Sequence, residues 1–152
     1  MRALVQRVAW AEVEADDRIA GRIEEGLLVY VGIGLGDTAD KADWLAKKIT
    51  DLRIFEDEAE KLNRSVHDVH GSVMVVSNFT LLADARKGRR PAFSAAASAE
   101  QAKPLHEAFL DALDRRGVRV QTGLFGAKMT VRSQATGPVN VIVDSPNGNE
   151  QT

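Results

Sequence analysis

Two short segments of the sequence carry groups that could do chemistry on a bound substrate. The first is Ser77-Asn78-Phe79-Thr80-Leu81, which follows the apolar run Val73-Met74-Val75-Val76. A strand end of this kind places hydroxyls, an amide and free backbone N–H groups at the rim of a sheet, although an ordinary strand terminus looks the same. The second is Thr136-Gly137-Pro138-Val139, which could equally be a plain turn. Only about 5–6% of X–Pro bonds in folded proteins are cis, so the Gly-Pro pattern alone does not predict a cis bond.

A glycine-rich segment, Gly32-Ile33-Gly34-Leu35-Gly36-Asp37, has the look of a dinucleotide-binding loop. Asp37 stands where that fingerprint requires its third glycine, and an acidic side chain would repel a pyrophosphate. We therefore expect structural glycines at a strand end, where unusual backbone angles are needed.

Metal and nucleophile chemistry have little support in the sequence. His67-Asp68-Val69-His70 has no third ligand at a familiar spacing, and His106 is expected to be a surface or packing residue. The chain has no Cys, which excludes thiolate catalysis and Cys-based zinc sites. It also has no G-x-S-x-G elbow, although a serine triad could still assemble in space. We expect neither a metal nor a cofactor.

Apolar periodicity predicts a single mixed α/β domain that would hold these segments. One helix should begin at Asp37 or Thr38, with Ala42, Leu45 and Ile49 on its apolar face. A second helix should lie between Ser98 and Arg116. Its start is ambiguous, because Ser98 and Gln101 resemble a capping box whereas Pro104 suggests a start within its own first turn. Strands are predicted at residues 2–9, 11–15, 27–31, 72–77, 118–120, 129–131 and 139–143, with a continuation at 19–23. The continuous apolar run at 27–31 is expected of a strand buried on both faces, and 72–77 is expected to be another buried strand. Residues 56–71 are polar and loop-like.

Composition limits the classes of function further. The chain has 152 residues, 44% of them hydrophobic, and a formal net charge of −2. That charge gives no whole-surface attraction for nucleic acid, so RNA binding would need a local patch such as Arg86-Lys87-Gly88-Arg89-Arg90. The start lacks a signal-peptide pattern and no apolar run approaches the roughly 20 residues of a membrane span, so a soluble, cytoplasmic protein is expected. Residues 145–152 should form a flexible polar tail.

Together, the two chemical segments resemble the D-aminoacyl-tRNA deacylase family, which carries S-Q-F-T-L at an active-site strand end and N-x-G-P-x-T near the C-terminus. Further family-like blocks occur in family order: Gln6-Arg7-Val8, Gly26-Leu27-Leu28-Val29, Arg53-Ile54-Phe55, Gly71-Ser72-Val73, Arg90-Pro91-Ala92-Phe93-Ser94 and Gln121-Thr122-Gly123. The resemblance extends over nearly all of residues 1–144, which it defines as a deacylase-like domain. Three positions depart from the family motifs: Asn78 replaces Gln, Ala135 replaces Asn and Asn140 replaces Thr.

The resemblance implies an enzyme that hydrolyses the ester between an amino acid and the terminal adenosine of tRNA. It also implies an α+β fold with a mostly antiparallel, barrel-like sheet and two main helices. Backbone donors near Phe79 and Thr80 would serve catalysis, assisted by a ribose hydroxyl of the tRNA. Ser77, Asn78, Phe79 and Met129 would bind substrate.

In the resembled family, a cis Gly-Pro step from one subunit enters the other subunit's site and excludes L side chains. Here that step would be Gly137-Pro138, held by Arg7, and the working form would be a homodimer. Two alternatives stay open at this point. The chain could be a non-catalytic nucleic-acid-binding module using Arg86 to Arg90, or an editor that removes glycine or another small residue from a wrong tRNA.

Overall fold

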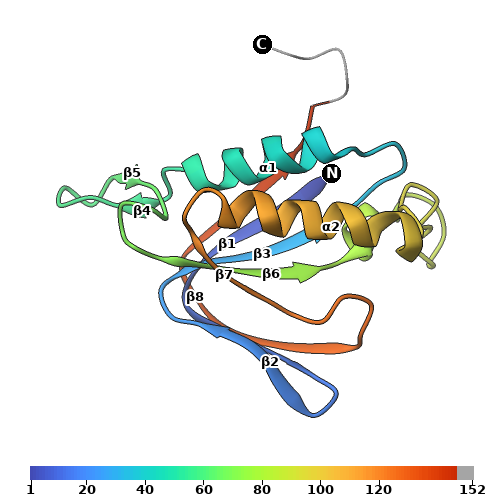
Figure 1. Cartoon of the computed structure of the whole chain (residues 1–152), viewed down its shortest axis with the longest axis horizontal. Coiled ribbons are helices and arrows are strands. Elements are labelled where there is room, and N and C mark those ends of the chain that lie inside the picture. The colour runs from blue at the N-terminus through green and yellow to red at the C-terminus, as the bar shows by residue number, and fades with distance from the viewer. Residues whose placement is uncertain (147–152) are drawn as a thin grey trace.

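A curved mixed sheet carries both long helices on one of its faces in the computed structural model, which describes residues 1–146 (Figure 1). The strands are β1 (Arg2–Ala15), β2 (Arg18–Ile23), β3 (Gly26–Gly32), β4 (Phe55–Glu56), β5 (Leu62–Arg64), β6 (Ser72–Ser77), β7 (Arg119–Thr122) and β8 (Met129–Asp144). The helices are α1 (Ala39–Asp51), the short 3-10 turn η1 (Phe79–Leu82) and α2 (Ala99–Asp114). The expected α+β class with two main helices is confirmed.

The main sheet has the order β2-β1-β3-β6-β7, with β8 paired to β1. β1 runs antiparallel to β2, β3 and β8, whereas β6 runs parallel to both β3 and β7. β8 pairs with one edge of β1 along its whole length. β3 and β2 pair with the opposite edge, β3 with the first half of β1 and β2 with the second. β4 and β5 form a separate small hairpin in a stretch that the sequence suggested was all loop.

The long strands β1 and β8 are each continuous, so the prediction of two strands at 2–9 and 11–15, and of two at 129–131 and 139–143, is wrong. The reason is that the β1–β8 pairing shifts register twice, between Gln6 and Val8 and between Val8 and Trp10, without ending. Irregularities of this kind bend a ribbon and increase its twist. They therefore produce the curl of β1 and β8 away from the helices (Figure 1).

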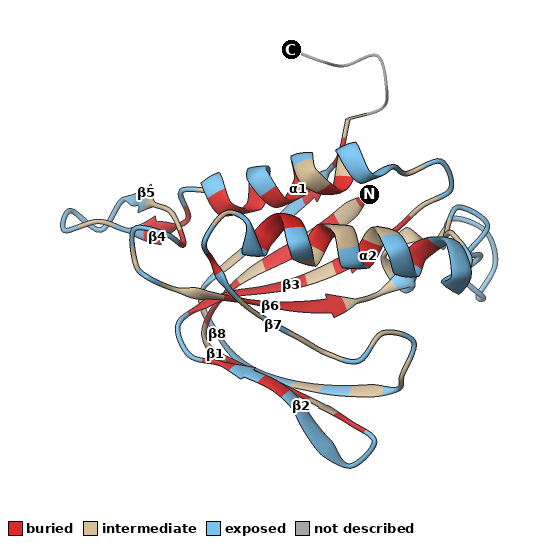
Figure 2. Cartoon of the chain, viewed as in Figure 1, coloured by how far each residue is buried: buried red, intermediate tan, exposed pale blue. Residues whose placement is uncertain are grey.

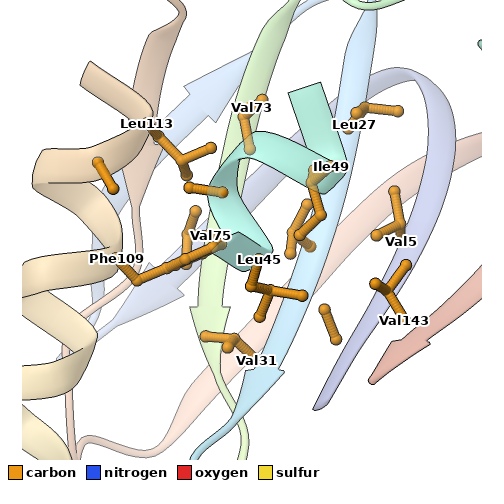
Figure 3. Close-up of a cluster of buried hydrophobic side chains, with 14 of the residues drawn as sticks. Val5, Leu27, Val31, Leu45, Ile49, Val73, Val75, Phe109, Leu113 and Val143 are labelled. Atoms are coloured by element: carbon orange, nitrogen blue, oxygen red, sulfur yellow. The ribbon is translucent and has the colours of Figure 1, made fainter. Parts of the chain in front are cut away.

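Two apolar clusters fill the two faces of the curved sheet. On the helix side, Leu45 and Ile49 of α1 and Phe109 of α2 pack with side chains of β3 and β6 (Figure 3). On the opposite face, Leu28 and Met74 belong to a second cluster enclosed by the curl. β3 and β6 are thus buried on both faces, as their unbroken apolar runs predicted (Figure 2).

Helix α2 begins where its capping box predicts. Ser98 Oγ accepts from the Gln101 N–H and Gln101 Oε1 accepts from the Ser98 N–H, both at 3.3 Å. Pro104 lies inside the helix, so the alternative start in its first turn is wrong. The one helical bond that a proline omits would have ended on Glu100, an exposed residue.

The N-terminal strand and the residues after β8 meet beside α1. The N–H of Ser145 donates to the Met1 carbonyl at 2.8 Å, and Ser145 is buried. Of the expected flexible tail at 145–152, residues 147–152 lie outside the described part of the chain. No helix among residues 1–146 is long and apolar enough to cross a membrane.

Candidate active site

A pocket of about 480 Å³ opens at the carboxyl ends of the parallel strands β3 and β6, a volume within the usual range for small-ligand sites. Ser77, Asn78 and Phe79 reach it from the end of β6, and Met129 from the start of β8. The rest of its lining is small or apolar: Val31, Ile33, Ala97, Ala99, Ala102, Phe125, Gly126 and Ala127. The structure thus brings together four of the site residues that the sequence suggested.

A close approach between two backbones positions η1 at this pocket. The Asn78 N–H donates to the Val31 carbonyl at 2.8 Å, so the chain turns out of the sheet next to β3. A Cβ on Gly32 would lie 3.1 Å from the Asn78 carbonyl oxygen and 3.2 Å from Leu82 Cγ. The glycine at position 32 therefore serves the packing of this turn against β3, which agrees with a structural role for the glycine-rich segment.

Asn78 caps the 3-10 turn with its own side chain. Its Oδ1 accepts from the Thr80 N–H at 3.2 Å and also from the Thr80 hydroxyl. The Thr80 N–H is therefore already engaged, and Thr80 does not line the pocket. By contrast, the N–H of Phe79 has no hydrogen-bond acceptor within residues 1–146. Phe79 is the residue of this turn that combines a place in the lining with a free backbone donor.

The pocket lining carries no titratable side chain among the residues that the structure describes. Its polar groups are the Ser77 hydroxyl, the Asn78 amide and the backbone. Groups of these kinds can orient a substrate and stabilise an oxyanion, but they cannot act as a general base near neutral pH. Among the described residues, the lining itself therefore offers no general base.

The Gly137-Pro138 step lies apart from this pocket, at an insertion in β8. The pairing of β8 with β1 jumps from Val8↔Ala135 to Gln6↔Asn140, so four residues of β8 face Arg7 alone. The Gly137-Pro138 bond is cis, and both residues are exposed.

Arg7 of β1 is buried and binds this insertion through its guanidinium group. Its Nε donates to the Thr136 carbonyl at 3.3 Å, its Nη1 to the Ile54 carbonyl at 3.0 Å, and its Nη2 pairs with Glu56 at 3.3 Å. The guanidinium thereby links the step to the residues that lead into β4. None of Arg7, Gly137 and Pro138 lines the pocket of the same chain.

Gly137 occupies a conformation and a space that suit no other residue. Its φ is +113°, and a Cβ there would lie 2.8 Å from Val139 Cγ2 and 3.0 Å from Arg7 Nη2. Of the neighbouring departures from the family motif, Asn140 accepts a hydrogen bond from Gln6 at 3.0 Å, and Ala135 is an exposed member of the β1–β8 pairing.

Sequence reasoning missed the part of the lining that comes from the loop before β8 and from the start of α2. Phe125, Gly126 and Ala127 begin two residues after the family-like block that ends at Gly123, which was the available signal. Ala99 and Ala102 are three residues apart on α2, a spacing that puts both on one helix face.

The three histidines belong to no metal-binding cluster in the part of the chain that the structure describes. Within residues 1–146 no cluster of His, Cys, Asp or Glu could hold a metal ion. His106 is buried in α2 with its ring centroid 5.3 Å from that of Phe125, and its Nδ1 has no partner in the same range. Of the two roles expected for His106, surface residue or packing residue, the structure shows packing, next to Phe125 of the pocket lining.

Burial lowers the pKa of His106, although Glu107 opposes the shift, so the folded protein favours neutral imidazole. Unfolded chains bind a proton at this position below about pH 6.5, and stability should therefore fall as the pH drops through that value. We expect the melting temperature to fall more steeply between pH 7.5 and pH 5.5 in the wild type than in His106→Leu. If the melting temperatures of the two proteins fell in parallel with pH, another group would control the loss of stability at acidic pH.

A basic loop lies next to the pocket, between η1 and α2. Its ends are closed by two hydrogen bonds between the backbones of Asp84 and Ala92, at 2.8 and 2.9 Å. Arg86 pairs with Asp84 at 2.7 Å. Lys87, Arg89 and Arg90 are exposed and form no ion pair within the described residues, which leaves three free cations at the tip.

Comparison with known proteins places the chain among close relatives. Residues 4–144 match the family model described as D-Tyr-tRNA(Tyr) deacylase. Proteins named D-aminoacyl-tRNA deacylase from Koribacter versatilis and Syntrophomonas wolfei are 52% and 49% identical, each over 95% of this chain and 97% of the relative. A solved structure named c-Myc DNA Unwinding Element Binding Protein is 38% identical, with a TM-score of 0.90 over 97% of this chain and 100% of the other. A probable eukaryotic D-amino acid tRNA deacylase has the same fold, with a TM-score of 0.81 at 17% identity over 93% of this chain and 97% of the other.

Proposed function

The chain belongs to the D-Tyr-tRNA(Tyr) deacylase family, and from that premise we propose how its pocket hydrolyses the ester of a mischarged tRNA. It is a hydrolase that acts on D-aminoacyl-tRNA and so edits mischarged tRNA. We further propose that it works in the cytoplasm, where charged tRNA is used.

The observation that carries the mechanism is a pocket with a free backbone donor and no titratable side chain. An aminoacyl ester is already activated, so orientation and charge stabilisation suffice to hydrolyse it. The terminal adenosine lies against Ser77, Asn78, Phe79 and Met129. The Phe79 N–H donates to the oxygen that becomes negative as water attacks, and the neighbouring ribose hydroxyl of the tRNA helps to activate that water.

Discrimination between D and L substrates is proposed to come from a second copy of the chain. The outer edge of β8 has no strand partner among residues 1–146, and β8 carries the exposed Ile142 as well as the Gly137-Pro138 step. A two-fold pair formed along this strand would insert each exposed step into the other subunit's pocket. Its backbone would leave room for a hydrogen or a D side chain and would clash with an L side chain. Glycyl-tRNA is then admitted together with D-aminoacyl-tRNA.

Thr80→Ala should retain most of the deacylase activity, with less than about a tenfold loss in kcat. The hydroxyl does not line the pocket, and the Thr80 N–H still donates to Asn78 and holds the cap. Single-turnover hydrolysis of D-aminoacyl-tRNA measures this directly. A loss of about 10³-fold, the scale of removing a key oxyanion donor, would make the Thr80 side chain essential and the backbone mechanism wrong.

The basic loop is proposed to hold the phosphates of the tRNA body. Changing Lys87, Arg89 and Arg90 to Ala should weaken tRNA binding and reduce the slope of log affinity against log salt by about 2 to 3. The preference for D over L should stay unchanged, because phosphate contacts do not read the amino acid. A charge-matched control removes Arg18, Lys48 and Lys61, which are exposed elsewhere. An equal loss of slope in both variants would mean that the tRNA does not dock on this loop.

A second candidate is nucleic-acid binding without catalysis, favoured by the 38% identical structure named for a DNA element and by the free cations of the loop. The two functions separate in one assay with purified protein. The editing account predicts release of free amino acid from D-aminoacyl-tRNA at substoichiometric enzyme. Binding without release would favour the second candidate.

A further inference from the structure

An aromatic pair joins the active-site turn to the basic loop. The ring centroids of Phe79 and Phe93 are 5.1 Å apart, with their planes at 69°, an edge-to-face arrangement. Phe79 and Phe93 are exposed residues, at 58% and 37%, so burial in the core does not account for either position. Edge-to-face pairs of this kind contribute beyond the area that they bury.

The contact with Phe93 restrains a residue that hydrogen bonds do not hold. The cap by Asn78 secures Thr80 and the turn that follows, whereas the Phe79 N–H has no acceptor within residues 1–146 and the residue is exposed. The direction of that N–H is set by ψ of Asn78 and φ of Phe79, the torsions on either side of the peptide bond that carries it. A neighbour that holds the ring restricts them.

Phe93 is itself firmly attached, at the base of the basic loop. Its chain neighbour Ala92 closes the loop against Asp84, and its own carbonyl accepts from the Ala96 N–H at 3.0 Å. Ala97, which lines the pocket, donates to the Ile33 carbonyl at 3.0 Å, so the segment after Phe93 is tied to the end of β3. Phe93 thus lies between three free cations and the pocket rim.

We propose that Phe93 is a positioning residue for deacylation, which holds the Phe79 ring and thereby fixes the direction of the Phe79 N–H. Because Phe93 lies at the base of the basic loop, phosphates bound on that loop change this direction. The inference rests on the proposed function for its chemistry, but the contact itself does not. Phe93 touches no reacting atom and acts through Phe79.

Kinetics separate positioning from substrate binding. Phe93→Leu should lower kcat on D-aminoacyl-tRNA about three- to tenfold with little change in KM, and Phe93→Tyr, which keeps the ring, should restore kcat. Thermal melts check that both variants are folded, as expected for a partly exposed side chain. An unchanged kcat in Phe93→Leu, or a loss confined to KM, would overturn the positioning role.

A spectroscopic experiment, which requires no enzyme activity, tests whether a phosphate backbone bound on the basic loop affects the Phe79 N–H through Phe93. The probe is a blunt-ended acceptor-stem RNA duplex, which can engage the loop but has no single-stranded end to enter the pocket. It should move the Phe79 amide resonance of the wild type, and should bind Phe93→Leu equally well without moving it. A resonance that stays still in the wild type, or that moves equally in Phe93→Leu, would overturn the link. If the wild type failed to deacylate D-aminoacyl-tRNA, the proposed function would be contradicted, and the amide resonance would still decide whether the basic loop and Phe79 are linked.

Discussion

Phe79→Pro should lower kcat on D-aminoacyl-tRNA by about 10²- to 10³-fold beyond the loss in Phe79→Ala, the scale of deleting one oxyanion-hole donor. Proline removes the free N–H at the pocket while leaving the turn possible. Residue 79 is the first of η1, a position that proline tolerates, and the preceding Asn78 has φ −149° and ψ 89°, outside the helical region that a following proline disfavours.

Phe79→Ala is the matched control for this change. It loses the ring and its contact with Phe93 but keeps the N–H, so its own loss should be about tenfold or less. Single-turnover rates at saturating enzyme report the chemical step for both variants. Equal rates for Phe79→Pro and Phe79→Ala would show that this N–H does not stabilise the transition state.

Gly137→Ala should reduce the preference for D- over L-aminoacyl-tRNA by at least about tenfold, because the step must move. The new Cβ would meet Val139 and the Arg7 guanidinium at 3.0 Å or less, in a backbone conformation with φ +113° that alanine rarely adopts. Gly117→Ala is the control, since it has a similar positive φ of +76° in open space at the end of α2. Rates on matched D- and L-aminoacyl-tRNA give the preference of each variant.

Mixed dimers then test whether the step acts across subunits. Co-expression of Gly137→Ala with an excess of Phe79→Pro should restore strict selectivity, because each Gly137→Ala pocket would face an intact step from its partner. An excess of the double variant Phe79→Pro, Gly137→Ala should not restore it. Selectivity that stays relaxed in both mixtures would place the filter within one chain or remove it from the mechanism.

The elements that could be predicted from sequence were those with one dominant signal. The unbroken apolar runs of β3 and β6 correctly indicated buried strands. The start of α2 had two competing signals, the Ser98–Gln101 box and Pro104, and the structure decides for the box. The continuity of β1 could not be predicted, because residues around Val8 lose alternation where the ribbon is bent by shifted pairing with β8. Such bends depend on a partner strand more than a hundred residues away.

The candidate site divides in the same way. Ser77 to Phe79 stood out because polar groups follow an apolar strand, and the structure puts them in the pocket. Ala97, Ala102 and Phe125 complete the pocket but carry no chemical signature, so only the packing of α2 and the loop before β8 identifies them. The cap that Asn78 places on Thr80 depends on backbone angles that no residue type specifies.

The most direct measurement of the central claim is a deacylation panel in which purified wild-type protein meets one tRNA charged with a D-amino acid, its L-enantiomer or glycine. The pocket and the exposed Gly137-Pro138 step together predict rapid hydrolysis of the D-aminoacyl and glycyl esters, with the L-aminoacyl ester left intact. Hydrolysis of the L-enantiomer at a comparable rate, or of none of the three, would contradict the account.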